Sequence, residues 1–391
     1  MDHHVTTHLL HISVVLLLFF PTNTLSSIGI NYGRIADNLP SPDKAIRLVK
    51  AIGAKKVKLY DANPDVLKAF ANSGVSFTVG IGNEYLTTLQ DPTAAETWVE
   101  CNVKPYLPAT KITSIAIGNE VLTSNDTSLS GCLLPAMQNI HAALVKFNLD
   151  QKITVTTAHS LSVLETSYPP SAGTFRQDLT GKMSPVIDFL AKTCSPFLIN
   201  AYPFFAYERN SNDVSLEFVL FQPNAGVVDS GNKLKYDNML FAQMDAVYAA
   251  LCKLGHKDVN IQISETGWPS KGDDNETGAS LENAKKYNGC LLKIVKQKKG
   301  TPAMPDYEFD IFVFVLFNEN LKPGPTSERN YGLFKHDGTP AYDLGFVGSS
   351  GGGGGGSGGG NGSRTPSPPL MFPPENPSGG YMPISSSAVC C

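Results

Sequence analysis

The sequence has few cysteines and none of the spacings that would join them into a metal site. Seven cysteines occur in 391 residues; five are widely scattered, and Cys390 and Cys391 end the chain. Since no Cys-x-x-Cys or Cys/His ligand spacing is present, the pattern indicates neither a zinc site nor a disulfide scaffold. We expect most of the five scattered cysteines to be buried as small apolar side chains.

Motifs of several other protein classes are missing as well. The formal net charge is −4, and no run of Lys and Arg alternates with aromatic residues, which argues against nucleic acid as a partner. No Gly-x-Gly-x-x-Gly follows the first predicted strand, and residues 28–346 contain no GxSxG, HExxH or P-loop motif. We therefore expect no metal, no cofactor and no prosthetic group.

The first 27 residues have the composition of a secretory signal peptide. An apolar stretch, His11–Phe20, is followed by the helix-breaking Pro21 and by small residues. The stretch is too short for an ordinary membrane-spanning helix. No Lys or Arg comes before it, although signal peptides usually have one ahead of their apolar run. We expect residues 1–27 to be removed and the protein to be secreted. Secretion makes three Asn-x-Ser/Thr triplets candidates for glycosylation, at Asn125, Asn275 and Asn361.

Residues 28–346 alternate short apolar runs with longer helical patterns. Eight runs are predicted as strands: Ile28–Asn31, Lys55–Tyr60, Ser76–Gly82, Ile112–Gly118, Ile153–His159, Phe197–Phe204, Val259–Glu265 and Phe309–Phe317. Continuous apolar strands that alternate with helices indicate a parallel sheet covered on both faces. We therefore predict one α/β domain with the (β/α)8 TIM barrel fold, and an open doubly wound sheet is the alternative.

Two helix boundaries can be predicted from capping residues. Ser41 is expected to cap a helix whose first residue is Pro42. The stretch PDVLKAFANSG predicts a second helix, which begins at Pro64 and ends at Gly74 because glycine is the usual residue after a helix.

The composition changes abruptly at Val347. Residues 347–391 are rich in Gly, Ser and Pro without periodicity, which predicts a disordered, flexible tail. The final YMPISSSAVCC is too short and too polar to be the hydrophobic signal for a glycosylphosphatidylinositol anchor. We therefore do not expect membrane attachment.

Polar and aromatic residues gather at the predicted carboxyl ends of the strands, where the active sites of TIM barrels lie. They are Tyr60, Asn83, Glu84, Asn119, Glu120, Tyr202, Phe204, Glu265, Trp268, Asn318, Glu319 and Lys322, with Glu328 shortly after. Glycoside hydrolysis requires two carboxyl groups beside the bond, and aromatic faces suit the apolar faces of sugar rings. Carboxyls and aromatics without metal ligands therefore favour a glycoside hydrolase.

The individual residues also have plainer interpretations. Glu84 alone is typical of a solvated loop carboxylate, although VGIGNEYL closely copies the later IAIGNEVL that contains Glu120. Trp268 is equally compatible with the core and with a sugar-binding platform. His159, at the end of the fifth predicted strand, could face the cleft, but a structural histidine is the expected case.

The ordered motifs IGINYG, VKLYDAN, IAIGNEVL, NAYPFFAY, ISETGWPSKG and FNENLKPGPTSERNYGLF resemble the plant endo-1,3-β-glucanases of glycoside hydrolase family 17. The resemblance extends from Ile28 to about Leu344. It implies a retaining mechanism with Glu120 as acid/base and Glu265 as nucleophile. It also implies that Glu319, Lys322 and Glu328 support this pair, and it gives Glu84 no catalytic role.

The resemblance implies a β-glucan polysaccharide substrate such as callose, laminarin or fungal-wall glucan, cleaved in the extracellular space or cell wall. We expect Tyr60, Asn119, Tyr202, Phe204, Trp268, Glu319, Lys322 and Glu328 to contact the substrate, and the enzyme to act as a monomer. Many relatives carry a glycosylphosphatidylinositol anchor signal that is absent here. A mixed-linkage 1,3-1,4-β-glucanase is the alternative enzyme, and a glucan-binding wall protein with weak activity is the alternative outside enzymes.

Overall fold

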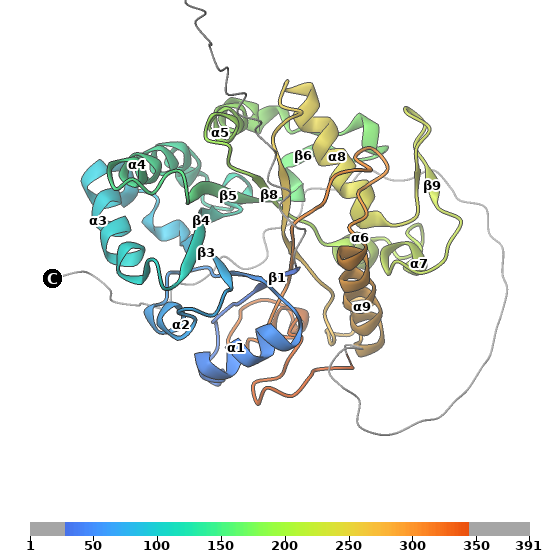
Figure 1. The fold of residues 1–391 in the computed structure, drawn as a ribbon. Coiled ribbons are helices and arrows are strands. Elements are labelled where there is room, and N and C mark those ends of the chain that lie inside the picture. The colour runs from blue at the N-terminus through green and yellow to red at the C-terminus, as the bar shows by residue number, and fades with distance from the viewer. Residues whose placement is uncertain (1–27, 344–391) are drawn as a thin grey trace, which may run out of the picture.

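Eight parallel strands close into a barrel in the computed structural model, which describes residues 28–343 (Figure 1). The strands are β1 Ile28–Asn31, β2 Lys56–Lys58, β3 Ser76–Ile81, β4 Lys111–Asn119, β5 Thr154–Ser160, β8 Phe197–Asn200, β11 Ile261–Thr266 and β12 Ile311–Val313. They pair in this order, and β12 pairs with β1 to complete the circle. The predicted TIM barrel is confirmed, and the open-sheet alternative is wrong. The predicted signal peptide, the tail and Asn361 lie outside the described residues.

Helices surround the barrel on its outer side (Figure 1). They are α1 Pro42–Ala51, α2 Pro64–Ala69, α3 Pro92–Asn102, α4 Leu133–Lys146, α5 Thr180–Lys192, α6 Pro203–Arg209, α7 Leu216–Val219, α8 Met239–Lys253 and α9 Leu281–Gln297. After β12, the described residues contain a short 3-10 helix, Thr326–Arg329, where a regular barrel would have its eighth helix. None of the helices that the structure describes is both long enough and apolar enough to span a bilayer.

The first three helices begin in the same way. Each has proline as its first residue, directly after the N-cap position, which Ser41, Asn63 and Asp91 occupy. The Asn63 and Asp91 side chains accept hydrogen bonds from the first turn, whereas the Ser41 side chain makes no such bond. Proline suits this position because its fixed φ matches the helix and its missing N–H has no partner to lose. The predicted start of α1 is therefore confirmed.

The predicted end of the second helix is wrong. α2 stops at Ala69, five residues before Gly74. Asn72 has a left-handed φ of 55°, and its N–H donates to the carbonyl of Ala109 at 2.6 Å. This tertiary hydrogen bond turns the chain before the glycine is reached, so Gly74, with φ 79°, ends a turn after the helix.

Small hairpins are inserted between the barrel elements. β6 Leu164–Thr166 pairs with β7 Thr174–Phe175 after β5, and β9 Val227–Val228 pairs with β10 Lys235–Tyr236 between β8 and α8.

The scattered cysteines are less buried than we expected. Cys194 and Cys252 are exposed, Cys132 and Cys290 are partly exposed, and all four are free thiols. Three of them begin or lie on helices that cover the barrel, where only one face of each helix is buried. The expectation of mostly buried cysteines is therefore wrong for these four.

Two barrel strands are irregular near their carboxyl ends. In β4 the pairing with β5 shifts register between Ala116 and Asn119. In β11 the pairing with β8 shifts between Ile263 and Glu265. Bulges of this kind change the direction of a side chain without ending the strand, and they are frequent next to active sites. Each irregular segment leads directly to one of the two predicted catalytic glutamates.

Candidate active site

Glu265 lies at the carboxyl end of β11 and is almost completely buried, with 6% of its surface exposed. Its Oε1 accepts hydrogen bonds from Lys58 Nζ at 2.9 Å and from the Tyr60 hydroxyl at 2.5 Å. Its Oε2 accepts a hydrogen bond from the Tyr202 hydroxyl at 2.8 Å. Three side chains from two other parts of the barrel therefore hold this carboxylate.

The surroundings of Glu265 favour its ionised form. Burial acts to raise the pKa of Glu265, but the positive charge of Lys58 and the hydrogen bonds from Tyr60 and Lys58 outweigh it, so the pKa lies below its usual value. Asn31 donates its amide N–H to the Tyr60 oxygen at 3.1 Å, which leaves the phenolic proton for Glu265. Burial and the charge of Glu265 raise the pKa of Tyr202 well above 10, so Tyr202 remains a donor.

Glu120 directly follows β4 and is partly exposed. Its backbone is left-handed, with φ 56° and ψ 30°, an uncommon conformation for a residue with a side chain. The backbone N–H of Glu120 donates to the carbonyl of Ala158 at 2.8 Å, and its Oε1 accepts from Asn200 Nδ2 at 2.7 Å. Asn200 is the residue of β8 that pairs with Glu265, so one asparagine connects the surroundings of both glutamates.

The twin motifs have different roles in the fold. The Asn83 side chain bonds both backbone groups of Asn119. Its Nδ2 donates to Asn119 O at 3.1 Å, and its Oδ1 accepts from Asn119 N at 2.8 Å. Glu84 itself is exposed in a short 3-10 helix. The first Gly-Asn-Glu motif therefore contributes its asparagine as a support for the second motif.

A second charged group lies after β12. Lys322 Nζ forms an ion pair with Glu328 Oε2 at 3.0 Å, and both side chains are largely buried. Glu319 is 1% exposed; its Oε1 accepts from the N–H of Ile35 at 2.8 Å. Burial raises the pKa of Glu319, although the charge of Lys322 acts in the opposite direction. The charge of Lys322 also contributes to lowering the pKa of Glu265, after the larger effects of Lys58 and Tyr60.

Comparisons with known proteins identify the family of the chain. The family model for glycosyl hydrolases family 17 matches residues 28–346. The chain belongs to this family. It is 58% identical to glucan endo-1,3-beta-glucosidase 11 of Arabidopsis thaliana, over 97% of this chain and 92% of that protein.

Two solved plant structures are also similar to this family 17 chain. The first is a beta-1,3-glucanase and allergen of Cryptomeria japonica pollen, with 42% identity and a TM-score of 0.79 over 82% of this chain and 99% of that one. The second belongs to a study of two plant beta-glucan endohydrolases with distinct substrate specificities, with 35% identity and a TM-score of 0.75 over 81% of this chain and 99% of that one.

Two predicted sugar-binding aromatics lie in the core of this family 17 barrel. Phe204 and Trp268 are both 0% exposed, and their rings pack edge to face at 5.2 Å. Trp268 also donates its indole N–H to the carbonyl of Gly278 at 2.9 Å. Because neither ring has a free face, the structure does not support the expectation that they stack on sugar. Phe204 is the second residue of α6, which begins three residues after the end of β8, and it is one of the buried residues of that helix.

Sequence reasoning missed two residues that contact the glutamates. Lys58 lies within the predicted strand Lys55–Tyr60 and Asn200 within the predicted strand Phe197–Phe204, and neither position is among the predicted site residues. A lysine inside a short strand usually has its charged end in water, yet Lys58 is only 2% exposed. The available signal was the alternation in KVKLY, which places Lys58 and Tyr60 on the same side of the strand.

Other predicted residues lie away from the carboxylates. His159 is buried against Phe197, with ring centroids 4.8 Å apart, and is a structural histidine in this fold. Asn125 and Asn275 are exposed in loops, as glycan acceptors must be, and their use stays a prediction.

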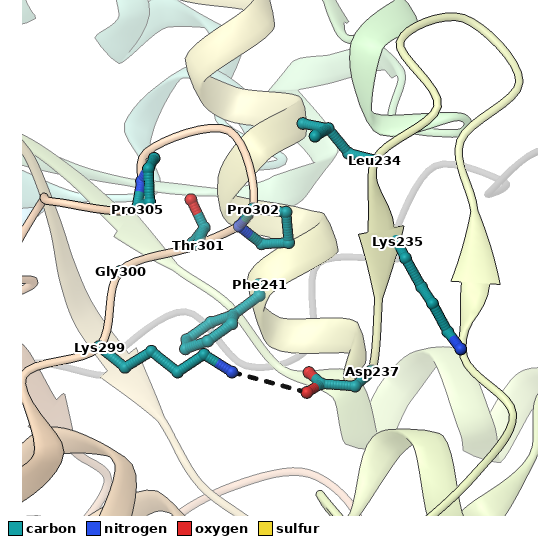
Figure 2. Close-up of a pocket in the computed structure, with 9 residues that line it drawn as sticks. All are labelled: Leu234, Lys235, Asp237, Phe241, Lys299, Gly300, Thr301, Pro302 and Pro305. Carbon is teal, nitrogen blue, oxygen red and sulfur yellow. Dashed lines mark ion pairs between the residues drawn. The ribbon is translucent and has the colours of Figure 1, made fainter.

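A cavity of about 360 Å³ lies elsewhere, between β10, the start of α8 and residues 299–305 (Figure 2). Its lining includes Phe241 and an ion pair between Lys299 and Asp237, with 3.7 Å between Nζ and Oδ2. None of the predicted site residues lines it, so it is separate from the candidate active site.

Proposed function

We propose that this family 17 chain is a secreted, retaining endo-hydrolase of (1→3)-β-D-glucosidic linkages in β-glucan. The observation that carries the catalytic assignment is the difference between the two glutamates. Glu265 is buried and accepts hydrogen bonds from a lysine and two phenols, whereas Glu120 is partly exposed and accepts from the neutral amide of Asn200. The names of the similar plant proteins support the substrate.

In the proposed mechanism, Glu265 attacks the anomeric carbon while Glu120 gives its proton to the departing glycosidic oxygen. The resulting glycosyl ester is then hydrolysed by water, and Glu120 takes a proton from that water. Retention requires the two carboxyl groups to lie about 5–5.5 Å apart. We further propose that Tyr60, Asn119, Tyr202, Glu319, Lys322 and Glu328 shape the sugar-binding cleft.

Replacement of each glutamate by glutamine tests the assignment. Glu265→Gln should abolish laminarin hydrolysis while oligosaccharide binding remains measurable, because the amide keeps the shape of the side chain and loses the nucleophile. Glu84→Gln is the matched control and should change the rate by no more than a few-fold. A Glu265→Gln enzyme with near-normal turnover would remove Glu265 from the mechanism.

The stereochemistry of the first product tests retention. Proton NMR of a fresh digest should show the β-anomer before mutarotation. Initial release of the α-anomer would make Glu265 a base that activates water, and the nucleophile assignment would then be wrong.

A mixed-linkage 1,3-1,4-β-glucanase remains the second candidate function. It is favoured by the similarity to a structure from a pair of plant endohydrolases whose substrate specificities differ. Rates on laminarin and on barley mixed-linkage glucan, measured with the same enzyme preparation, separate the two functions. Faster cleavage of the mixed-linkage polymer would favour the second.

A further inference from the structure

The two oxygens of Glu265 have unequal hydrogen-bond partners. Oε1 accepts from both Lys58 and Tyr60, whereas Oε2 accepts only from Tyr202 among the described side chains. A carboxylate oxygen offers about two lone-pair sites for hydrogen bonds. Both sites of Oε1 are therefore used, and one site of Oε2 remains available to form a bond.

Lys58 is held in a rigid position. It is the last residue of β2, where it pairs with Asn31 of β1, and its carbonyl accepts from the N–H of Tyr32 at 2.9 Å. Its ammonium is buried, 2.9 Å from Glu265 Oε1 and 4.4 Å from the centre of the Tyr60 ring. Water cannot replace this cation easily, because both partners of the ion pair have less than a tenth of their side-chain surface exposed.

We propose that Lys58 is a positioning residue that keeps Glu265 ionised and occupies Oε1, so that Oε2 attacks the sugar. This proposal rests on the retaining function proposed above. In the first step a lone pair of Oε2 forms the bond to the anomeric carbon, and the electron pair of the broken C–O bond goes to the leaving oxygen with a proton from Glu120. Oε1 becomes the ester carbonyl oxygen, still within reach of the Lys58 ammonium.

The same cation acts again in the second step. Water attacks the anomeric carbon, the bond to Oε2 breaks, and its electron pair returns to the carboxylate. Because negative charge reappears partly on Oε1, the nearby ammonium stabilises the departing carboxylate. Lys58 therefore assists both halves of the reaction without touching the substrate.

The pH dependence of kcat/KM on laminarin tests this role. Its acid limb reports the ionisation of the essential base in the free enzyme. Lys58→Met should move this limb to higher pH and lower kcat/KM by about 10- to 100-fold at neutral pH, the usual effect of losing one charged hydrogen bond. Lys58→Arg should keep the acid limb close to its wild-type position, because it restores the charge.

Lys56→Met is the matched control. Lys56 lies two residues earlier on the same strand and pairs with Asp310 Oδ2 at 2.5 Å, so its removal also breaks an ion pair of β2, here with the residue that precedes β12. The acid limb of kcat/KM for Lys56→Met should coincide with that of the wild type. If Lys58→Met does not fold, Lys58→Gln replaces it, since glutamine keeps a polar N–H donor on a slightly shorter side chain and removes the charge.

An unchanged acid limb in the folded Lys58→Met or Lys58→Gln variant would overturn the proposal. An acid limb displaced equally in Lys58→Arg and Lys58→Met would also overturn it, because the positive charge at this position would then have no effect on the ionisation of Glu265. These failures are distinguishable from failure of the proposed function, which the wild type and Glu265→Gln test independently of Lys58.

A trapped intermediate tests the choice of oxygen directly. A 2-deoxy-2-fluoro laminaribiosyl fluoride should leave the sugar attached to Glu265, and a crystal structure of this adduct should show the bond at Oε2 with Oε1 still hydrogen-bonded to Lys58. A bond at Oε1 would refute the assignment.

Discussion

Replacement of His159 by leucine should remove a large part of the loss of stability in acid. His159 is 1% exposed, and neither ring nitrogen has a hydrogen-bond partner among the described residues. Burial lowers the pKa of His159 to about 3, because the charged imidazolium would have to enter an apolar site beside Phe197. In the unfolded chain the same group titrates near its ordinary pKa of about 6.5.

The sign and size of the effect follow from proton linkage. Well above pH 6.5 the histidine is neutral in both the folded and the unfolded state, so its titration does not change the free energy of unfolding. As the pH falls from about 6.5 towards 3, only the unfolded chain binds the proton, so folding becomes less favourable. At pH 5 the difference amounts to about 1.5 pKa units, or roughly 2 kcal/mol of unfolding free energy relative to pH 8.

Urea unfolding of the wild type and of His159→Leu at pH 8 and pH 5 measures this contribution. The free energy of unfolding should fall by about 2 kcal/mol less in the leucine variant over this interval. His336→Gln serves as the control, because His336 is exposed and should leave the wild-type dependence unchanged. An equal loss of stability in the wild type and His159→Leu would refute the reasoning.

Three further outcomes are expected. Asn83→Ala should reduce laminarin turnover by up to about 30-fold with little change in KM, because the β4 end that carries Glu120 loses two hydrogen bonds, each worth about 1 kcal/mol. An effect no larger than that of Glu84→Gln in the same assay would contradict this. Trp268→Phe should lower the midpoint of thermal unfolding, because it removes a buried hydrogen bond and leaves a cavity, and it should change KM by no more than about twofold. A large rise in KM with an unchanged midpoint would instead support Trp268 as a sugar-binding platform. Tyr60→Phe should move the acid limb of kcat/KM to higher pH, because Glu265 loses a donor to its ionised form; a limb that stays in place would show that the phenol does not support ionisation.

The barrel was predictable because its strands are buried on both sides. The eight predicted runs overlap β1, β2, β3, β4, β5, β8, β11 and β12, since burial on both faces requires the continuous apolar character that the sequence shows. Their bounds are less accurate: the predicted Phe197–Phe204 runs into α6, and Phe309–Phe317 extends beyond both ends of β12. The end of α2 was not predictable, because a hydrogen bond from Asn72 to Ala109 connects segments far apart in the chain. Local propensity contains no information about such a partner.

The site was predictable only as far as residue type and strand position determine it. Tyr60, Tyr202 and Glu265 meet because parallel strands end on one side of the barrel. The orientation of a side chain at that end depends on tertiary packing, which places Trp268 in the core and the Lys58 ammonium inside the barrel. No local pattern separates a buried from an exposed Trp268, whereas the alternation in KVKLY already places Lys58 on the same side of its strand as Tyr60.

The register shifts in β4 and β11 have a consequence for how the chemistry of this barrel can change. Each shift is absorbed within a few residues, so the pairing of the other strands continues unaltered around the circle. The path of the backbone to each carboxyl group is therefore set at the irregular end of its own strand, and Asn200, which pairs with Glu265 and donates to Glu120, links the two ends. A single insertion or deletion at one irregular segment could widen the space between the two groups enough to admit a water molecule, while the hydrogen-bonded frame stays closed. Whether the anomeric configuration is preserved or reversed would then depend on one strand end. The rest of the barrel would be the same in both cases.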